Sequence, residues 1–568
     1  MPTLRILDPR LNRKHIFLIA VSIGLAIAAC WVIPIRLLKV SWYTFGYLGD
    51  EYLYAQRVQP LFPGISATNS LNGVGDPNVI SPFWLEDSLR GLVTLLHVDV
   101  ISFIWSWRFL FPIALASSFI FLARSCLLRR ARAWNATLQY AAAAAAFTML
   151  YCAYDAVISF PPCHGFIERF PTNIEYLLSV LLAAQYVRFL SKPTLRNGVL
   201  LALVSAVTTY LRLYLAFPWS IAVIIGVVYL LATRQLSFRI AAVTAVVLIF
   251  AMCPWLYVVW ANSKSQDFAE LNLRYFGPPS KFIIHPHWIL YMSFGLIYFA
   301  GAFFLEKRHR IFAIGTAVTM LLLPFICSSM PFASEILGYD RFGCFYLVAF
   351  LTLALLVLGN CTLAWRGRRG RAQASRLLYS CGAATLAFSA VIAAMNASYD
   401  FAGFPQKTFP DVREDLQFIP AYKWIREQTP EGSLVLVDDG FDWSIGAKFN
   451  ANGLPIISGF APDGTYMLAG DDIFQIVARR PRVYTHRLMG FVLTTKDVGA
   501  LGYLHRGTFG LPVPGELYTK ALMRFRPAYI LWRKTKRAPI PRGYGGALRE
   551  HAETVYTDGV CEIWKLNY

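Results

Sequence analysis

The sequence Gly49-Asp50-Glu51-Tyr52 places two adjacent carboxylates at the start of a long polar loop, shortly after the first hydrophobic segment. A carboxylate can act as a general base toward a hydroxyl group. An acidic pair at the mouth of a membrane-embedded helix bundle is a candidate functional site by default. The alternative is structural, because Asp is a favoured N-cap residue and Asp50 could cap a helix that begins near Glu51.

Two arginines stand where predicted membrane helices meet the outer polar loops, Arg212 at the end of one apolar segment and Arg341 just before another. Burying a guanidinium near the membrane is costly unless an anion meets it. A lipid phosphate is one such anion, and the planar fork of arginine suits phosphate because it donates two hydrogen bonds at once. The alternative is pairing within the chain, with Asp340, Glu335 or Asp155 as candidates.

The composition fixes the class of protein that carries these residues. The chain has 568 residues, of which 56% are hydrophobic and 15% charged. This composition, with repeated long uncharged runs, is too apolar for a soluble enzyme and predicts a polytopic α-helical membrane protein. The net charge of +20 does not indicate nucleic-acid binding, because the basic residues gather in short loops between apolar runs, as membrane orientation requires.

Apolar runs of about 20 residues predict about eleven transmembrane helices. The run 198–232 could form one helix or two, and this decides whether the number of predicted spans is even or odd. As one helix it would be about 52 Å long, which exceeds the hydrocarbon core, so two helices that turn near Leu211-Arg212-Leu213-Tyr214 are predicted. The predicted ranges are 15–35, 101–123, 134–152, 173–190, 198–213, 215–232, 240–260, 289–305, 311–330, 343–364 and 377–396.

The basic residues orient these predicted helices in a cell (inner) membrane. With a cytoplasmic N-terminus, every predicted inner loop carries Lys or Arg, as the positive-inside rule requires. The outer side then holds the first outer loop 36–100, the later outer loops and the residues from 397 onward. Within the first outer loop, apolar residues from Phe83 to Leu96 recur at helical spacing, which predicts a helix lying along the membrane interface.

Residues 397–568 differ in pattern from the predicted transmembrane domain 1–396. They predict a small extracytoplasmic α/β domain. The predicted elements are an amphipathic helix from Asp411 to Gln428, a buried strand over 433–438, a helix over 516–525, a second buried strand over 528–532, and a closing hairpin over 555–564 that turns at Asp558-Gly559.

Together these features resemble the GT-C superfamily of integral-membrane glycosyltransferases, which use polyprenyl-phosphate-linked sugars and include the protein mannosyltransferases and the lipid A aminoarabinose transferases. Gly49-Asp50-Glu51 matches the acidic motif of the family's first loop, and Asp340-Arg341-Phe342 is similar to an arginine–aromatic pair before a late span. The soluble ending, with Trp424-Ile425-Arg426-Glu427 and Val555-Tyr556…Ile563-Trp564, also looks like that of the family. No Asp-x-Asp motif stands in the second outer loop.

The resemblance implies a glycosyltransferase that moves a sugar from a polyprenyl-phosphate donor to an acceptor on the outer face, by direct displacement with inversion. Asp50 would be the base, and Glu51 would help to position the acceptor. Some relatives have a second carboxylate in the loop 153–172, so Asp155 or Glu168 could bind the acceptor or a divalent metal ion, unless they are solvated loop charges. The predicted substrate-binding residues are Asp155, Glu168, Arg169, Arg212, Arg274 and Arg341.

The expected partners are the lipid-linked sugar donor, an acceptor that is a lipid, a glycan or a protein, and the bilayer itself. No cofactor is implied beyond that metal ion. An alternative function is a transporter or flippase of lipid-linked sugars, which breaks no bond. Such proteins tend to show paired repeats with broken spans, and the sequence shows no such repeat. A third alternative is an assembly scaffold, in which Asp50 would be freely replaceable.

Overall fold

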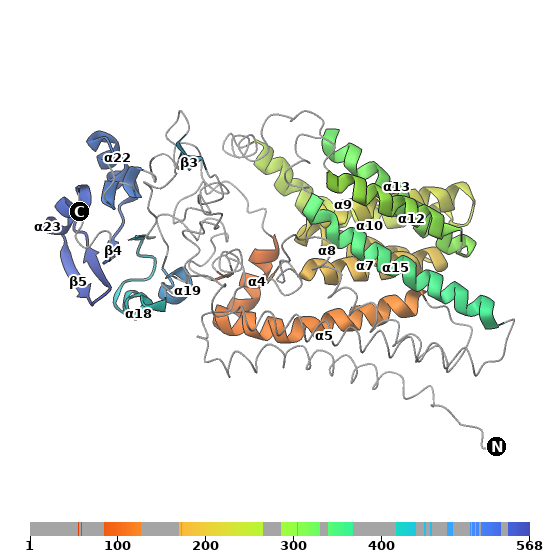
Figure 1. Ribbon diagram of the computed structural model, residues 1–568, viewed down its shortest axis with the longest axis horizontal. Helices are drawn as coiled ribbons and strands as arrows, with labels where there is room; N and C mark the ends of the chain where they lie inside the picture. Colours follow the sequence, from red (N-terminus) through yellow and green to blue (C-terminus); the bar gives the residue numbers. More distant parts are fainter. Residues whose placement is uncertain are drawn as a thin grey trace, which may run out of the picture. The chain divides into compact units, whose positions relative to one another are not determined.

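The protein is represented by a computed structural model (Figure 1), in which the chain divides into two compact units. Unit 1 comprises 1–40, 106–257 and 276–405, and unit 2 comprises 41–105, 258–275 and 406–568. The structure describes residues 55, 58–59, 84–126, 170–171, 173–264, 286–303, 305–329, 339–366, 416–438, 448–449, 455–456, 474–480, 500, 503–505, 507–509, 513–534 and 543–568.

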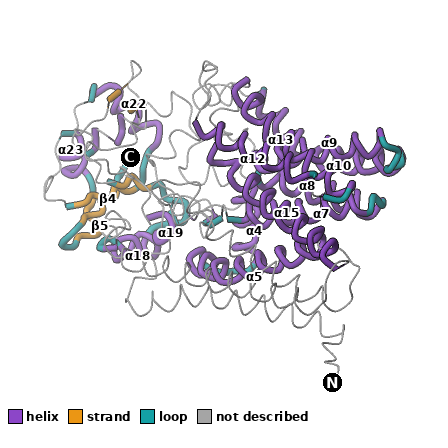
Figure 2. The backbone as a smooth tube through the Cα atoms, turned by 45° about the vertical axis from the view of Figure 1, so that its right-hand side comes forward, coloured by secondary structure: helices purple, strands orange, loops and turns teal. Residues whose placement is uncertain are grey.

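Unit 1 is built from long helices (Figure 2). Within the described residues, three helical segments are long and apolar enough to cross a membrane: Ile174–Ser191, Leu215–Ala232 and Phe238–Tyr257. The full helices are α5 (Val100–Cys126), α7 (Ile174–Ser191), α8 (Leu195–Leu211), α9 (Leu213–Ala232), α10 (Phe238–Ser263), α12 (Pro286–Ala302), α13 (Lys307–Ser329) and α15 (Tyr339–Arg366). These segments support the predicted membrane class, and the count of about eleven spans stays a prediction.

Most of the predicted membrane helices coincide with helices of the structure. The ranges 101–123, 173–190, 198–213, 215–232, 240–260, 289–305, 311–330 and 343–364 fall on α5, α7, α8, α9, α10, α12, α13 and α15. The ranges 15–35, 134–152 and 377–396 lie outside the described residues.

The run 198–232 forms two helices rather than one, as predicted, and the break falls at Arg212. The backbone of Arg212 lies at φ −154° and ψ 85°, outside the helical region. Pro218 removes one helical hydrogen bond near the start of α9 because it has no N–H group. The chain can therefore reverse its direction at Arg212.

Contacts at the two ends of α7 show that α8 runs antiparallel to it. Near the C-terminal end of α7, Gln185 Nε2 donates a hydrogen bond to the carbonyl of Asn197 at 3.0 Å, at the start of α8. Near the N-terminal end of α7, Glu175 contacts Arg212, which follows the last residue of α8. The two helices therefore form a hairpin.

α9 returns along α7 in the parallel direction. Trp219 Nε1 donates to Ser179 Oγ at 2.9 Å, and the hydroxyl of Tyr186, two turns further along α7, donates to the carbonyl of Ala222 at 2.7 Å. Because α9 is parallel to α7 and α8 is antiparallel to it, α8 and α9 are also antiparallel. The break at Arg212 therefore separates two opposed helices.

The connections that the sequence places on the inner side gather at one end of unit 1, here called the basic end and defined by 192–196, 233–239 and 306–310. Arg308 Nη1 donates to the carbonyl of Ser191 at 2.6 Å, and His309 Nε2 lies 3.3 Å from the hydroxyl of the same serine. Arg310 Nε donates to the carbonyl of Ala302 at 3.2 Å, near the C-terminal end of α12. The C-terminal end of α9 also lies at the basic end, because α9 is parallel to α7, whose C-terminal end is there.

Unit 2 contains a sharp corner between α4 (Trp84–Leu95) and the start of α5. The segments Leu85–Leu95 and Val100–Trp107 are bent by 111° and would count as a fourth span if taken together. His97 takes a left-handed φ of 51° after α4. Asp99 caps α5, because its carboxylate accepts hydrogen bonds from the N–H of Ile101 at 2.9 Å and of Ser102 at 3.3 Å.

α4 confirms that the apolar residues before Val100 form a helix, although its position along a membrane stays a prediction. Leu85, Leu89 and Val93 follow one another at four-residue intervals and are buried. The exposed apolar residues lie at the C-terminal end of the helix and beyond it, where Leu95 is 75% and Leu96 54% exposed.

The C-terminal part of unit 2 holds a four-stranded mixed sheet. Its strands lie in the order β1 (Val435–Val437), β4 (Tyr529–Arg533), β6 (Cys561–Lys565) and β5 (Glu553–Thr557). β1 is parallel to β4, while β6 is antiparallel to both β4 and β5. A separate antiparallel pair joins β2 (Lys448–Phe449) to β3 (Pro455–Ile456).

Helices and stacked aromatic rings complete the domain around this sheet. The helices are α18 (Ile419–Gln428), α19 (Phe474–Ala478), α22 (Gly515–Phe525) and α23 (Tyr544–His551). In the core, Trp532 of β4 stacks on Trp564 of β6 with ring centroids 5.8 Å apart, and Tyr518 stacks on Tyr544 at 4.4 Å. The predicted buried strands, the helix over 516–525 and the closing hairpin are confirmed, whereas α23 was not predicted.

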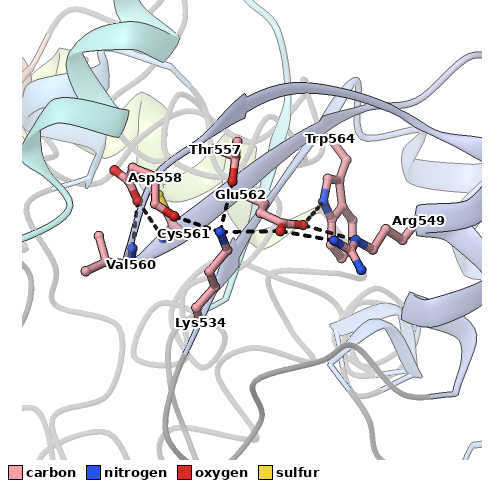
Figure 3. A network of polar contacts seen from close by, with 8 residues as sticks. All are labelled: Lys534, Arg549, Thr557, Asp558, Val560, Cys561, Glu562 and Trp564. Atoms are coloured by element: carbon pink, nitrogen blue, oxygen red, sulfur yellow. Dashed lines mark hydrogen bonds and ion pairs between the residues drawn. The ribbon is translucent and has the colours of Figure 1, made fainter.

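One carboxylate ties α23 to the sheet (Figure 3). Glu562, which is 9% exposed, receives two nitrogens of Arg549, with Nη2 3.1 Å from Oε1 and Nε 3.0 Å from Oε2. Trp564 Nε1 donates to Oε2 at 3.1 Å, and Lys534 Nζ lies 3.4 Å from Oε1. Glu562 of β6 thus pairs with a cation of α23, Arg549, and with a cation that follows β4, Lys534.

A second carboxylate fixes the turn of the hairpin, at the residue that the sequence predicts. Asp558 accepts hydrogen bonds from the N–H groups of Val560 and Cys561 and from the hydroxyl of Tyr556, each at 2.8 Å. Burial by itself would raise the pKa of Asp558, but these hydrogen bonds stabilise the charged carboxylate and lower its pKa below the usual value. The folded hairpin therefore favours the ionised form.

We expect Asp558→Ala to lower the free energy of unfolding of the hairpin by about 1–2 kcal/mol, because two N–H groups and a hydroxyl lose their acceptor. Hydrogen exchange of the peptide 553–565 should become faster. With its depressed pKa, Asp558 contributes its full stability above about pH 5 and loses it as the pH falls through the folded-state pKa. This acid-dependent loss should disappear in Asp558→Ala. Glu553→Ala, at an exposed strand position, serves as the control and should leave exchange unchanged.

We expect reporter fusions to report one sidedness for the basic end and the opposite one for the C-terminal end of α10. A periplasm-active reporter fused after Lys192 or after Gln235 should be silent, and one fused after Lys264 or Tyr399 should be active. A cytoplasm-active reporter at the same positions should give the inverse pattern. Activity at both Lys192 and Lys264 would contradict the predicted orientation.

Candidate functional site

Arg212 is the predicted site residue whose side chain the described part of the structure places. Of Arg341, the structure describes only the position in α15. The remaining predicted site residues lie outside the described residues, namely Asp50, Glu51, Asp155, Glu168, Arg169 and Arg274.

Local sequence explains why the chain breaks at Arg212. The hydroxyls of Thr208 and Thr209 donate back to the carbonyls one turn earlier, at 2.7 and 2.9 Å, and such bonds tend to bend a helix. The N–H of Arg212 closes the last turn of α8 on the carbonyl of Thr208 at 2.7 Å, and its own carbonyl accepts from the N–H of Leu215 at 3.1 Å. One residue therefore ends α8 and starts α9.

Arg212 forms an ion pair with Glu175, with 3.1 Å between Nε and Oε1 and only 11% and 12% of the two side chains exposed. Glu175 lies in the first turn of α7, where the helix dipole favours a negative charge, and Arg212 follows the last residue of α8, where the dipole favours a positive one. The low exposure makes the interaction stronger than that of a surface pair. We call this region of unit 1 the Arg212 end.

Hydrogen bonds from tryptophan bring further helices to the Arg212 end. Trp107 Nε1 of α5 donates to Asn173 Oδ1 at 3.0 Å, just before α7 begins. The ring of Trp107 also meets Phe170 edge to face at 5.8 Å. In α9, Trp219 donates to Ser179, one turn beyond Glu175. A buried tryptophan usually finds a partner for its N–H group, and Trp219, which is fully buried, finds it in Ser179.

The first turns of α15 lie at the same end. Phe345 packs edge to face on Trp219, with ring centroids 4.9 Å apart. Phe345 stands one helical turn after Arg341, so the backbone of Arg341 also belongs to the Arg212 end. The structure thus places the backbone of Arg341 at the same end of unit 1 as Arg212, although the two residues are far apart along the chain.

Glu175 is the residue that sequence reasoning missed. It falls within the predicted span 173–190, while the predicted partners of Arg212 are Asp340, Glu335 and Asp155. The available signal was an acidic residue directly after the start of an apolar run whose other charged residue, Arg188, lies near its far end, so that Glu175 stands at the same predicted end of the bundle as Arg212. Pairing within the chain is therefore present, through an acid that the prediction did not name.

Two buried arginines of the C-terminal domain serve its internal packing. Arg480 donates through Nη2 to the carbonyl of Arg426 at 2.8 Å and through Nε to Thr429 Oγ1 at 3.0 Å, which caps the end of α18. Arg533 Nη2 donates to the hydroxyl of Tyr422 at 3.0 Å, and its guanidinium lies 4.5 Å from the ring centroid of Phe418. Their contacts hold α18 against the sheet and the neighbouring segment.

Arg479 of the C-terminal domain interacts electrostatically with Asp99, at the corner before α5. Burial lowers the pKa of Arg479, the neighbouring Arg426 lowers it further, and the carboxylate of Asp99 acts in the opposite direction. Asp99 therefore lies within electrostatic reach of Arg479. The described end of the predicted first outer loop and the C-terminal domain are close to each other within unit 2.

No protein-family model matches this sequence, and no curated protein matches it. Within the described residues, no group of three or more His, Cys, Asp and Glu side chains is arranged to hold a metal ion. Asp155 and Glu168, the residues that could share one, lie outside that part of the chain.

We expect replacement of either partner of the Glu175–Arg212 pair to destabilise unit 1 more than replacement of both. Glu175→Leu leaves a buried cation and Arg212→Leu a buried anion, and each single change should cost about 3 kcal/mol, while the double variant should recover much of this loss. Thermal unfolding of the four proteins in one detergent measures the coupling. The exposed pair Glu516–Lys520 provides the control, for which the same cycle should show no measurable coupling.

Proposed function

We propose that the protein is a GT-C-type glycosyltransferase that moves a sugar from a polyprenyl-phosphate donor to a lipid, glycan or protein acceptor. The observation that carries the proposal is the gathering of Arg212 and the Arg341 segment of α15 at one end of the apolar bundle. A polyprenyl phosphate has an apolar chain that suits the sides of membrane helices and an anionic group that suits cations at their ends.

In this proposal the protein lies in a cell (inner) membrane, with the basic end in the cytoplasm and the Arg212 end outside. Two observations support this orientation. The connections 192–196, 233–239 and 306–310 carry basic residues and lie at one end of unit 1, which is the pattern expected of cytoplasmic loops. The C-terminal domain belongs to the same unit as the segment 84–105, in agreement with an extracytoplasmic location of both.

The proposed reaction needs a base on the acceptor and cations on the leaving group. Asp50 removes the proton of the acceptor hydroxyl, whose oxygen attacks the anomeric carbon and forms the new glycosidic bond. The bond between that carbon and the phosphate oxygen breaks with inversion, and the polyprenyl phosphate leaves with both electrons of the bond. Arg212 and Arg341 stabilise the departing phosphate, and Glu51 positions the acceptor.

The other proposed site residues complete the outer surface of the reaction site. Asp155 and Glu168 would bind the acceptor or share a divalent metal ion, and Arg169 and Arg274 would contact anionic groups of the substrates. The C-terminal domain would recognise the acceptor. Each of these assignments rests on the sequence and its resemblance to the family.

We expect Asp50→Asn to lower turnover by about 10²–10⁴-fold while donor binding is retained, because the amide keeps the shape of the side chain but cannot take a proton. Product formation and the melting temperature should be measured on the same purified sample. If Asp50 only caps a helix, Asn would replace it well, and both turnover and melting would stay near those of the wild type. A protein that moves the donor across a bilayer without releasing product would support the transporter alternative.

We expect Arg341→Lys to weaken donor binding clearly at an unchanged melting temperature, because lysine keeps the charge but loses the two-pronged geometry. Direct binding of the lipid-linked donor to purified protein measures this effect. Arg524→Lys, at an exposed position of α22, is the matched control and should bind the donor like the wild type. Unchanged binding by Arg341→Lys and by Arg341→Ala would remove Arg341 from the donor site.

A further inference from the structure

We propose that Glu175 is the resting counter-anion of Arg212 and that the phosphate group of an anionic lipid-linked ligand displaces it from the guanidinium. The ligand class rests on the proposed function. Glu175 would then set the affinity of the site for phosphate, as a positioning residue that competes with the ligand rather than assists it.

The geometry of the pair carries this inference. The contact joins Arg212 Nε to Glu175 Oε1 at 3.1 Å, between two residues that stand at the ends of different helices. Arg212 lies at the chain break, where its backbone closes α8 and starts α9, and a shift of its side chain alone can leave these backbone hydrogen bonds in place. Both side chains are largely buried but keep a small exposed fraction, 11% and 12%.

Electrostatics explains why the two anions exclude each other. A guanidinium that is largely removed from water needs a counter-charge, and Glu175 supplies it in the absence of ligand. A phosphate at the same guanidinium brings at least one further negative charge close to the carboxylate. Like charges within a few ångströms at low exposure repel strongly. The phosphate therefore binds at the expense of the Glu175 contact.

A permanent structural pair predicts the opposite response to neutralisation. If Glu175 only holds Arg212 in place, its loss lets the arginine move away and weakens phosphate binding. If Glu175 competes, its loss removes a negative charge from the guanidinium, which then binds an external phosphate more tightly. The direction of the change in affinity therefore separates the two roles.

The test is the binding of farnesyl phosphate to the full-length protein in nanodiscs. It compares wild type, Glu175→Gln and Arg212→Gln, with farnesol as the probe that lacks phosphate. Gln keeps the size and hydrogen-bonding capacity of Glu and therefore preserves folding better than an apolar replacement. Glu516→Gln, at an exposed ion pair, is the matched control for the loss of one carboxylate.

We expect Glu175→Gln to bind farnesyl phosphate about fivefold more tightly than wild type, which corresponds to a coupling of about 1 kcal/mol. Arg212→Gln should lose at least about tenfold in affinity, the range of a charge-assisted contact. Glu516→Gln should match wild type, and farnesol affinity should be the same in all four proteins. Farnesyl phosphate should also raise the melting temperature of Glu175→Gln more than that of wild type, because tighter binding stabilises the folded state further.

Weaker binding of farnesyl phosphate by Glu175→Gln, or equal affinities in wild type and Glu175→Gln, would overturn the proposal. So would a wild type that binds farnesyl phosphate no better than farnesol. If Glu175→Gln melts too low for measurement, Glu175→Asp provides the second comparison. The shorter acid should hold Arg212 less well, and farnesyl phosphate should again bind more tightly than to wild type.

The outcome is separable from that of the proposed function. Tighter phosphate binding by Glu175→Gln together with no sugar transfer by wild type would keep the anion exchange and reject the enzyme. Sugar transfer by wild type together with weaker phosphate binding by Glu175→Gln would keep the enzyme and reject the exchange.

Discussion

The ion pair between Glu175 and Arg212 joins the start of α7 to the break between α8 and α9. A charged side chain at the end of apolar helices must find a counter-charge, because neither lipid nor the helix core can solvate it. Here the counter-charge comes from the start of the neighbouring helix, and both partners stand at the helix ends where the dipoles favour them. The pair closes the α7–α8 hairpin at the point where the chain turns into α9.

The same constraint gives this end of the bundle its chemical character. The guanidinium of Arg212, paired with the Glu175 carboxylate, is largely desolvated and lies at the same end of unit 1 as the first turns of α15. The proposed ligand, an anionic headgroup with an apolar chain, has two parts that would suit such a setting. The cost of burying the arginine is therefore offset by a structural partner at rest, and a phosphate ligand would take over that role during binding.

In the C-terminal domain, single carboxylates accept hydrogen bonds and ion pairs from several elements. Glu562 joins the ends of β4 and α23 to β6, and Asp558 fixes the hairpin that ends the sheet. The parallel pairing of β1 with β4 requires a long connection, because parallel neighbours cannot be joined by a tight turn. Within unit 2, the approach of Arg479 to Asp99 brings this domain to the start of α5.

Features that depend on neighbouring residues could be predicted from the sequence: the apolar helices, the break near Arg212, the buried strands and the turn at Asp558. Length, apolar periodicity and turn-forming residues encode them locally. Three features were decided only by the tertiary structure. They are the pairing of Glu175 with Arg212, the parallel alignment of β1 with β4, and the place of α15 at the Arg212 end. These contacts join residues far apart in the sequence, which offers several acids and several strands as equivalent candidates. Packing of whole helices and strands selects among them, because the apolar faces must be buried and the charges at the helix ends must be paired at the same time.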